Sequence, residues 1–368
     1  MKVLVCIPCL LTGGTEIQTL SLVEALVKAG HSPIIVCYFE HNDDMVRRYI
    51  DAGADVRLLS AEGRRPIGVK NTIKFLWNGL RQIVKPEHIE VAHVQYMNPG
   101  ALPVIILKML GARRILATTH TNADIYSKNG LRIIKFLTRN VLTAFQCITL
   151  RAENGYFGNS SLFDGYLKRH FTIYNCLPEY ISIRTTPRQF NRDIITIGVV
   201  SRLELIKGMD LVIPAFEKAY QCNSNIRLLV VGDGSLRSTM EQQARESDLN
   251  DLIKFVGRQP QSTLQGYYDQ IDVLLMPSRS EGFGLTAIEG MARGCVPVVA
   301  NTGGLPEVVT TECGYLHKPD DLKDIADKIL DASDIKTIAD KSYNSFQRSR
   351  EFSSEKYYGQ IRDLYATM

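Results

Sequence analysis

Two glutamates bracket a glycine-containing loop in the last third of the chain. Glu281 and Glu289 have seven residues between them, with Gly282 and Gly284 near the expected start of a helix. A helix N-terminus offers unpaired amide groups and a partial positive charge, which suit phosphate. A carboxylate can accept hydrogen bonds from two hydroxyl groups, as acidic residues do from ribose in dinucleotide-binding folds. The pattern therefore predicts a ligand with phosphates in the middle and a hydroxyl-rich group at each end, such as a nucleotide sugar.

A second charged cluster follows the first apolar strand of the back half. Arg202 and Lys207 stand shortly before Gly208, where another helix is expected. Arginine offers a bidentate fork and lysine a compact charge, and both suit a diphosphate. If a glycosidic bond to a diphosphate broke, negative charge would grow on the leaving oxygen, so these cations would stabilise the transition state more than the ground state. A surface pair without function is the alternative interpretation.

The elements that must position these residues alternate along the whole chain. Short apolar runs alternate with amphipathic stretches, which indicates βαβ units and parallel sheets. Strands are expected at 2–7, 33–38, 55–59, 90–94, 114–118 and 147–150, and then at 193–200, 226–231, 253–256, 273–276 and 296–300. Residues 175–187 lack periodicity and contain two prolines, which predicts a hinge. Two doubly wound sheets in series should leave an interdomain cleft faced by the carboxyl ends of the strands.

In this order and spacing, the motifs resemble those of retaining glycosyltransferases of family four, which have the GT-B fold. The segments that carry the resemblance are Gly13-Gly14-Thr15-Glu16, Arg202, Lys207-Gly208, Val231-Gly232-Asp233-Gly234, Phe255-Val256-Gly257, Pro277-Ser278 through Glu289, Pro297-Val298-Val299 and Gly303-Gly304 with Glu307. The resemblance implies an α/β protein with two Rossmann-like domains. Residues 1–172 would form the acceptor domain, joined by a C-terminal helix over 352–368 that crosses back, and residues 173–351 the donor domain.

The resemblance also implies roles for single residues. Arg202 and Lys207 would hold the diphosphate, Glu281 the hydroxyl groups of the donor sugar, and Glu289 the ribose. His120, at the end of the strand over 114–118, would contact and orient the sugar rather than act as a general base. The remaining implied donor contacts are Gly13, Gly14, Gly257, Arg258, Gly282, Phe283, Gly284 and Leu285.

Acceptor-side candidates are fewer. Asn122 and Asp124 follow His120, and Glu16 lies at the start of the first expected helix. Glu16 could equally cap that helix. No Asp-x-Asp triplet occurs in the chain, so we expect no metal and no cofactor, with Arg202 and Lys207 supplying the positive charge.

Composition limits the class of protein. Of 368 residues, 45% are hydrophobic and 22% charged, which is typical of globular domains and excludes a disordered or fibrous chain. The first 172 residues carry 21 Lys and Arg against 13 Asp and Glu, whereas the rest carry 22 against 26. A basic front half is suited to an anionic acceptor or membrane surface. Nucleic acid is not an expected partner, because no nucleic-acid-binding module is recognisable.

The expected location is cytoplasmic. No apolar run approaches the ~18–20 residues of a membrane span, and the apolar residues 3–11 are interpreted as a buried strand rather than a secretory signal. Eight scattered cysteines suggest reduced thiols. A basic amphipathic helix over 71–85 leaves two interpretations open, a helix on an anionic membrane and a helix that faces the core.

These observations lead to one hypothesis with two alternatives. We expect a retaining transferase that moves a sugar from a UDP- or GDP-linked donor to a hydroxyl group of a glycan or lipid-linked acceptor, in bacterial-type surface polysaccharide or glycolipid synthesis. A sugar-nucleotide 2-epimerase would instead yield a new nucleotide sugar without an acceptor. A non-catalytic nucleotide-sugar-binding partner subunit would show no turnover as a purified chain.

Overall fold

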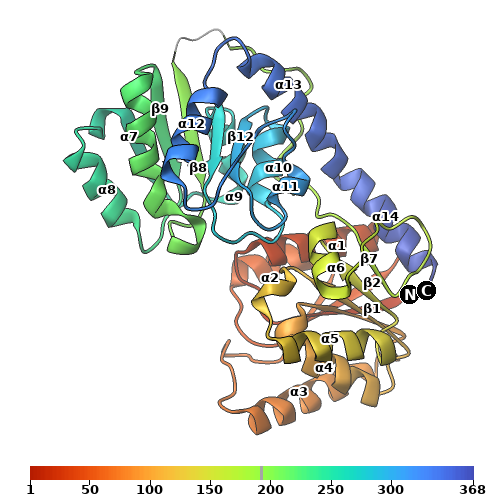
Figure 1. The fold of residues 1–368 in the computed structure, drawn as a ribbon. Coiled ribbons are helices and arrows are strands. Elements are labelled where there is room, and N and C mark those ends of the chain that lie inside the picture. Colours follow the sequence, from red (N-terminus) through yellow and green to blue (C-terminus); the bar gives the residue numbers. More distant parts are fainter. Residues whose placement is uncertain (191–193) are drawn as a thin grey trace. The chain divides into compact units, whose positions relative to one another are not determined.

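Two separate parallel sheets organise the chain in the computed structural model, which describes residues 1–190 and 194–368. Unit 1 comprises Met1–Cys176 and Ser354–Met368, and unit 2 comprises Leu177–Ser353 (Figure 1). The boundaries thus fall after residue 176 rather than 172, and after residue 353 rather than 351. Residue 193, the expected start of the first strand of the back half, lies outside the described residues. Among the described residues, no helix is both long and apolar enough to cross a membrane.

Unit 1 is built on a seven-stranded parallel sheet in the order β3-β2-β1-β4-β5-β6-β7. Its strands are β1 (Lys2–Ile7), β2 (Ser32–Cys37), β3 (Asp55–Leu58), β4 (Val91–Gln95), β5 (Arg114–Thr119), β6 (Ala144–Cys147) and β7 (His170–Thr172). Its helices are α1 (Gly14–Lys28), α2 (Asp43–Asp51), α3 (Val69–Val84), α4 (Met97–Met109), α5 (Lys128–Asn140), α6 (Leu150–Phe157) and α14 (Ser354–Ala366), with a 3₁₀ turn η1 (Ala123–Ile125).

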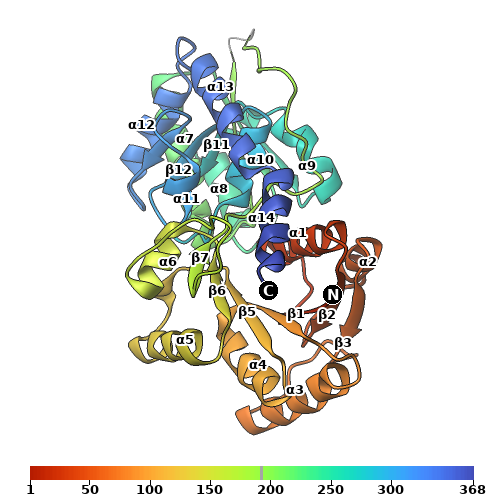
Figure 2. The ribbon, with the colours of Figure 1, turned by 90° about the vertical axis from the view of Figure 1, so that its right-hand side faces the viewer.

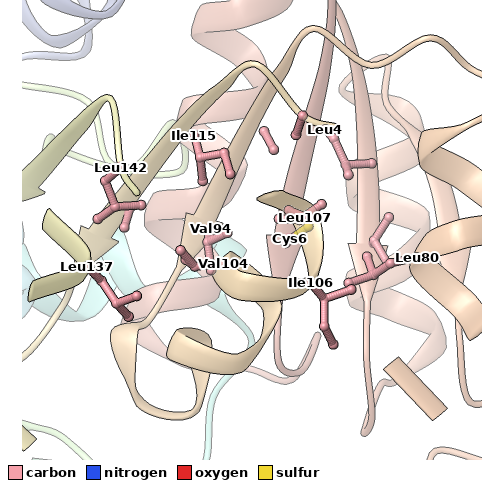
Figure 3. Close-up of a cluster of buried hydrophobic side chains, with 14 of the residues drawn as sticks. Leu4, Cys6, Leu80, Val94, Val104, Ile106, Leu107, Ile115, Leu137 and Leu142 are labelled. Atoms are coloured by element: carbon pink, nitrogen blue, oxygen red, sulfur yellow. The ribbon is translucent and has the colours of Figure 1, made fainter. Parts of the chain in front are cut away.

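Helices cover both faces of this sheet. The layer α3, α4, α5 and α6 lies on one face, and α1, α2 and α14 lie on the other (Figure 2). Between the sheet and the first layer is a core of aliphatic side chains that includes Leu80, Leu107 and Leu137 (Figure 3). The apolar stripe of α3 packs its Leu76 and Leu80 into this core, so the core-facing interpretation is correct for that stripe.

Unit 2 has a six-stranded sheet in the order β10-β9-β8-β11-β12-β13. Its strands are β8 (Ile195–Val200), β9 (Ile226–Val231), β10 (Ile253–Gly257), β11 (Val273–Met276), β12 (Val296–Ala300) and β13 (Tyr315–His317). Its helices are α7 (Val212–Cys222), α8 (Arg237–Glu246), α9 (Gln261–Tyr268), α10 (Leu285–Ala292), α11 (Leu305–Val308), α12 (Leu322–Ala332) and α13 (Ile338–Ser349), with 3₁₀ turns η2 (Leu205–Lys207), η3 (Met209–Leu211), η4 (Asn250–Leu252) and η5 (Arg350–Phe352).

Two expected elements are placed differently in the structure. The strand expected at 147–150 is wrong by three residues, because β6 ends at Cys147 and the Thr149 hydroxyl accepts a hydrogen bond from the Ala152 amide at 3.1 Å, which caps α6. The last helix begins at Ser354 rather than at 352, and Phe352 belongs to unit 2. Within unit 1, α14 packs beside α1, and its Tyr365 hydroxyl contacts Nδ1 of buried His93 at 2.8 Å.

Candidate functional site

The charged residues of unit 2 gather where the order of the strands reverses. β8 and β11 are neighbours in the sheet, but the chain runs outward from β8 through β9 and β10, and from β11 through β12 and β13. Arg202 and Lys207 follow β8, and Glu281 follows β11. Open parallel sheets bind their ligands outside the carboxyl ends of the strands at such a point. The topology therefore places the residues predicted from sequence at the position where a ligand site is expected.

Lys207 and Glu281 form an ion pair. The Lys207 Nζ atom lies 2.7 Å from Oε2 of Glu281, and the two side chains are 21% and 16% exposed. Arg202 has an exposed side chain in the same connection after β8. The structure thus brings two of the predicted residues, Lys207 and Glu281, into direct contact. The guanidinium of Arg202, five residues before Lys207, is exposed to solvent.

Close backbone packing brings the two loops together. Gly208 has a left-handed backbone with φ of 68°, and a Cβ atom at this position would overlap the carbonyl oxygen of Pro277. Only glycine permits this approach at low cost. Gly208 directly follows Lys207, and Pro277 directly follows β11, so this contact sets the distance between Lys207 and the loop that carries Glu281.

An arginine that the sequence analysis did not single out fixes the same loop. Arg279 forms a bidentate pair with Asp210, at 2.7 and 2.8 Å, and its Nε lies 2.7 Å from Oδ1 of Asp320. The Arg279 amide also donates to the Ile206 carbonyl at 3.0 Å. The guanidinium lowers the pKa of Asp210 through hydrogen bonds and charge. In the sequence, this pair is indicated only by a basic residue, Arg279, in the loop after β11 and an acidic residue, Asp210, shortly after Gly208.

The loop ends at an uncapped helix N-terminus. Gly284 has a φ of 105° and precedes α10, which has no side-chain hydrogen bond at its N-cap. The first amides of a helix have no partner within the helix and carry a partial positive charge. Phe283 is buried, with its ring 5.7 Å from that of Phe352 in an edge-to-face contact. At Phe283, therefore, the backbone rather than the ring is the group that could reach a ligand.

Glu289 is almost fully buried within α10. Its Oε2 accepts a hydrogen bond from the Tyr268 hydroxyl at 2.6 Å, and its Oε1 accepts one from the Tyr180 hydroxyl at 2.7 Å. Burial raises the pKa of Glu289, while the two hydroxyl donors act in the opposite direction. Each carboxylate oxygen can accept a second hydrogen bond, so these tyrosines use half of the accepting capacity. Sequence analysis missed both, since Tyr180 lies 109 residues away along the chain.

Gly257 and Arg258 stand at the end of β10. Gly257 has a φ of 72°, and its carbonyl accepts a hydrogen bond from the Gly232 amide at 2.9 Å. The guanidinium of Arg237 lies over Gly257 and pairs with Asp233 at 2.9 Å. Arg258 is exposed. The predicted base contact thus lies at the carboxyl edge of the same sheet.

Unit 1 has its own reversal point, between β1 and β4. Gly13 is the N-cap of α1 and Gly14 its first residue. The buried carboxylate of Glu16 folds back onto Gly13, where a Cβ atom would lie 2.5 Å from Oε2. Glu16 also accepts a hydrogen bond from the Cys9 thiol at 3.2 Å. Burial, with the charge of Glu16 next in size, raises the pKa of Cys9 to about 12, so this thiol stays protonated.

His120 follows β5 and is buried. Its Nε2 lies 2.9 Å from Oε1 of Gln95, the last residue of β4. With Gln95 as acceptor, Nε2 carries the proton and Nδ1 keeps the lone pair. Burial lowers the pKa of His120 to about 3, so the imidazole is neutral at pH 7. A neutral ring held by an amide suits a contact and orienting role.

The other candidates of unit 1 lie close to His120 in the sequence. Asn122 precedes η1, and its carbonyl accepts a hydrogen bond from the Tyr156 hydroxyl at 3.3 Å. Asp124 lies in η1 with an exposed side chain. Within residues 1–190 and 194–368, no group of three or more His, Cys, Asp or Glu side chains is arranged to hold a metal ion.

Comparison with known proteins identifies the family. A model described as "Glycosyltransferase Family 4" matches residues 12–153, and one described as "Glycosyl transferases group 1" matches residues 185–349. The two models match one unit each. The chain therefore belongs to the glycosyltransferases of family four, and its two Rossmann-like units are those of the GT-B fold.

Named relatives and solved structures agree with this assignment. A phosphatidylinositol N-acetylglucosaminyltransferase subunit of Arabidopsis thaliana is 25% identical over 315 residues, which are 84% of this chain and 68% of that protein. The GDP-mannose-dependent monoacylated alpha-(1-6)-phosphatidylinositol monomannoside mannosyltransferase of Corynebacterium glutamicum is 28% identical over 274 residues, 70% of each chain. The crystal structure of Anabaena HepE with UDP and glucose superposes with a TM-score of 0.80 at 17% identity, and both chains are covered in full.

Proposed function

We propose that this glycosyltransferase is a retaining enzyme that transfers a sugar from a UDP- or GDP-linked donor to a hydroxyl group of a glycan or lipid-linked acceptor. The observation that carries the proposal is the contact between Lys207 and Glu281 at the reversal point of unit 2. It joins a cation suited to a diphosphate to a carboxylate suited to sugar hydroxyls, next to the uncapped N-terminus of α10.

Each group has a defined task in donor binding. Arg202 and Lys207 face the diphosphate, Glu281 accepts hydrogen bonds from the donor sugar, and Glu289 accepts them from the ribose. The structure of HepE was solved with UDP and with UDP-glucose, and the Corynebacterium relative is named for GDP-mannose. These relatives support a nucleotide-sugar donor and leave both bases open.

The transfer step exchanges one bond for another at the anomeric carbon. The acceptor oxygen attacks this carbon from the face that the diphosphate leaves, so the anomeric configuration is retained. The bond from the anomeric carbon to the diphosphate oxygen breaks, and the acceptor proton passes to that oxygen. Arg202 and Lys207 stabilise the negative charge that grows there. His120 stays neutral because its pKa is lowered to about 3 by burial, and it orients the sugar without taking the proton.

The names of the relatives support a class of acceptor. Proteins named for phosphatidylinositol glycosylation occur among them in a plant and in a bacterium. We propose a glycolipid or a lipid-linked surface polysaccharide precursor of bacterial type, glycosylated at the cytoplasmic face of a membrane. Glu16, Asn122 and Asp124 of unit 1 are the side chains proposed to contact it.

The experiment combines donor screening with product analysis. Thermal stabilisation by UDP- and GDP-sugars selects the donor, and mass spectrometry and NMR of the product with lipid-linked acceptors give the linkage and anomeric configuration. Arg202→Met and Lys207→Met should each lower kcat/KM by about 10²–10³-fold, the usual cost of losing a group that stabilises developing charge. Lys323→Met, on the exposed surface of α12, is the matched control.

Four outcomes contradict parts of the proposal. Full activity in a variant that lacks both cations refutes the site. An inverted product refutes retention. A new nucleotide sugar formed without acceptor identifies an epimerase, and donor binding without any turnover identifies a binding subunit.

A further inference from the structure

Three neighbouring helices of unit 1 contain all of its surplus positive charge. α3, α4 and α5 pack side by side on one face of the sheet (Figure 2). Their sequences contain no Asp or Glu. They carry eight cations, all exposed: Lys70, Lys74, Arg81, Lys108, Lys128, Arg132, Lys135 and Arg139. The excess of 21 basic over 13 acidic residues in the first 172 is also eight, so the charge asymmetry of the sequence is concentrated on this one layer.

The same layer exposes apolar side chains. Its inner side chains, among them Ile106, Leu107 and Leu137, are buried against the sheet (Figure 3). On its outer side, Val69 on α3, Met109 on α4 and Phe136 on α5 are 74%, 68% and 62% exposed. Ile73, Ile105 and Ile133 are also exposed. Each helix is therefore apolar on two sides, and only one of them is covered within unit 1.

Cations and exposed apolar residues alternate along these helices. The adjacent pairs are Val69 with Lys70, Ile73 with Lys74, Lys108 with Met109, Arg132 with Ile133, and Lys135 with Phe136. No ion pair of these cations is found in the described part of the chain. A surface used only for solubility would intersperse acidic residues and avoid large exposed apolar groups.

We propose that the outer side of α3, α4 and α5 docks flat on an anionic lipid bilayer. The apolar side chains enter the boundary between headgroups and acyl chains, and the neighbouring cations meet the lipid phosphates. A nucleic acid or another polyanion would satisfy the cations but would leave Met109 and Phe136 without an apolar partner. The surface of an anionic bilayer satisfies both kinds of side chain, because phosphates and acyl chains lie next to each other there.

This docking gives the basic half of the chain a function that the donor site does not use. The docking extends the proposed function, because a lipid-linked acceptor is presented at the same membrane surface. Its role in catalysis therefore rests on the proposed function. The docking itself does not depend on the transfer reaction, so the two can fail separately.

The test measures binding of the full chain to vesicles by flotation. We expect binding to vesicles of phosphatidylcholine with phosphatidylglycerol, weak binding to phosphatidylcholine alone, and a decrease with added salt. Each cation near an anionic surface contributes about five-fold in affinity. Lys108→Glu/Arg132→Glu/Lys135→Glu should therefore weaken binding by about a hundred-fold or more, whereas Lys254→Glu/Lys323→Glu/Lys336→Glu, with the same change of net charge on unit 2, should not.

A second variant pair separates a bilayer from a polyanion. Ile133→Ser/Phe136→Ser should weaken vesicle binding by at least about ten-fold, as expected for apolar side chains withdrawn from an apolar phase. Ile335→Ser, at a comparably exposed position of unit 2, is the control. Unchanged vesicle binding in Ile133→Ser/Phe136→Ser, or equal binding of wild type to duplex DNA, would overturn the proposal. Circular dichroism establishes that each variant is folded, and transfer to a water-soluble acceptor should stay at wild-type level in all of them.

Discussion

Removing the hydroxyl group of Tyr268 tests whether Glu289 is held as a buried, ionised carboxylate. Tyr268 donates to Oε2 of Glu289 at 2.6 Å and Tyr180 donates to Oε1 at 2.7 Å. Burial raises the pKa of Glu289, and both hydroxyl donors act against that rise because they stabilise the ionised form. Tyr268→Phe deletes one donor and keeps the buried ring in place.

The expected loss depends on the protonation of Glu289. A hydrogen bond to a charged group contributes about 1.5–3 kcal/mol, and one between neutral groups about 0.5–1.5 kcal/mol. Tyr268→Phe should therefore lower the free energy of unfolding by about 1.5–3 kcal/mol when Glu289 is ionised, and by less when it is protonated. For a unit of this size the larger loss corresponds to a fall in Tm of about 3–12 °C.

The sign of the pH dependence follows from the raised pKa. The pKa of Glu289 is higher in the folded than in the unfolded chain. The stability linked to this group is therefore complete below the unfolded pKa and is lost as the pH rises through the folded pKa. Removing the Tyr268 hydroxyl raises the folded pKa further, so the difference in unfolding free energy between wild type and variant should grow as the pH rises.

The assay is urea unfolding at a series of pH values across the range in which carboxyl groups titrate, with donor binding measured by calorimetry in parallel. Tyr267→Phe is the matched control, because Tyr267 is the preceding residue of α9 and is only half-buried. It should change neither the stability nor its pH dependence. A loss in Tyr268→Phe that is the same at every pH would refute the ionised carboxylate, and no loss at all would refute the hydrogen bond as a source of stability.

Two further substitutions test the backbone and the histidine of the candidate site. Gly208→Ala should lower the free energy of unfolding by at least about 1–2 kcal/mol and reduce donor affinity, because φ is 68° and the new Cβ would meet the Pro277 carbonyl. The control is Gly266→Ala, whose Cβ would have no neighbour within 4 Å and which should be neutral or stabilising. Equal urea midpoints for the two variants would contradict the argument. His120→Gln should lower the rate without changing the shape of the pH–rate profile near neutrality, because burial lowers the pKa of His120 to about 3. The opposite result would be a limb in the wild-type profile close to the ordinary histidine pKa of about 6.5 that disappears in the variant. Such a limb would show that His120 titrates during turnover.

The sequence predicts the interior of the fold better than its edges. Strands such as Ile226–Val231 and Val296–Ala300 match the expected ranges, because their apolar runs are buried on both faces of a parallel sheet. β7 and β13 were not predicted, since each is an edge strand of three residues. The strand expected at 147–150 was displaced because Thr149 lies among apolar residues but acts as a helix cap.

Some residues of the candidate site were predicted from the sequence and others were not. Lys207 and Glu281 were found because each stands next to a glycine between a strand and a helix, and Glu289 was found because it lies about one turn into the helix that follows. Tyr180 and Tyr268 were not found, because a hydroxyl group that meets a carboxylate across 109 or 21 residues leaves no local pattern. Side chains that orient a binding group depend on tertiary packing, whereas the binding groups themselves follow the backbone motif.

The pairing of Lys207 with Glu281 bears on the energetics of the site. Two opposite charges that are mostly shielded from water each cost desolvation energy, and their contact at 2.7 Å offsets part of that cost. A donor with a diphosphate and sugar hydroxyls would give each of them a new partner, the phosphate for Lys207 and the hydroxyl groups for Glu281. Binding would then replace one set of charge-assisted hydrogen bonds by another, instead of burying a bare cation and a bare anion. The contact also holds both side chains, which have many rotamers, in place before the ligand arrives, so less conformational entropy remains to be lost when the donor binds.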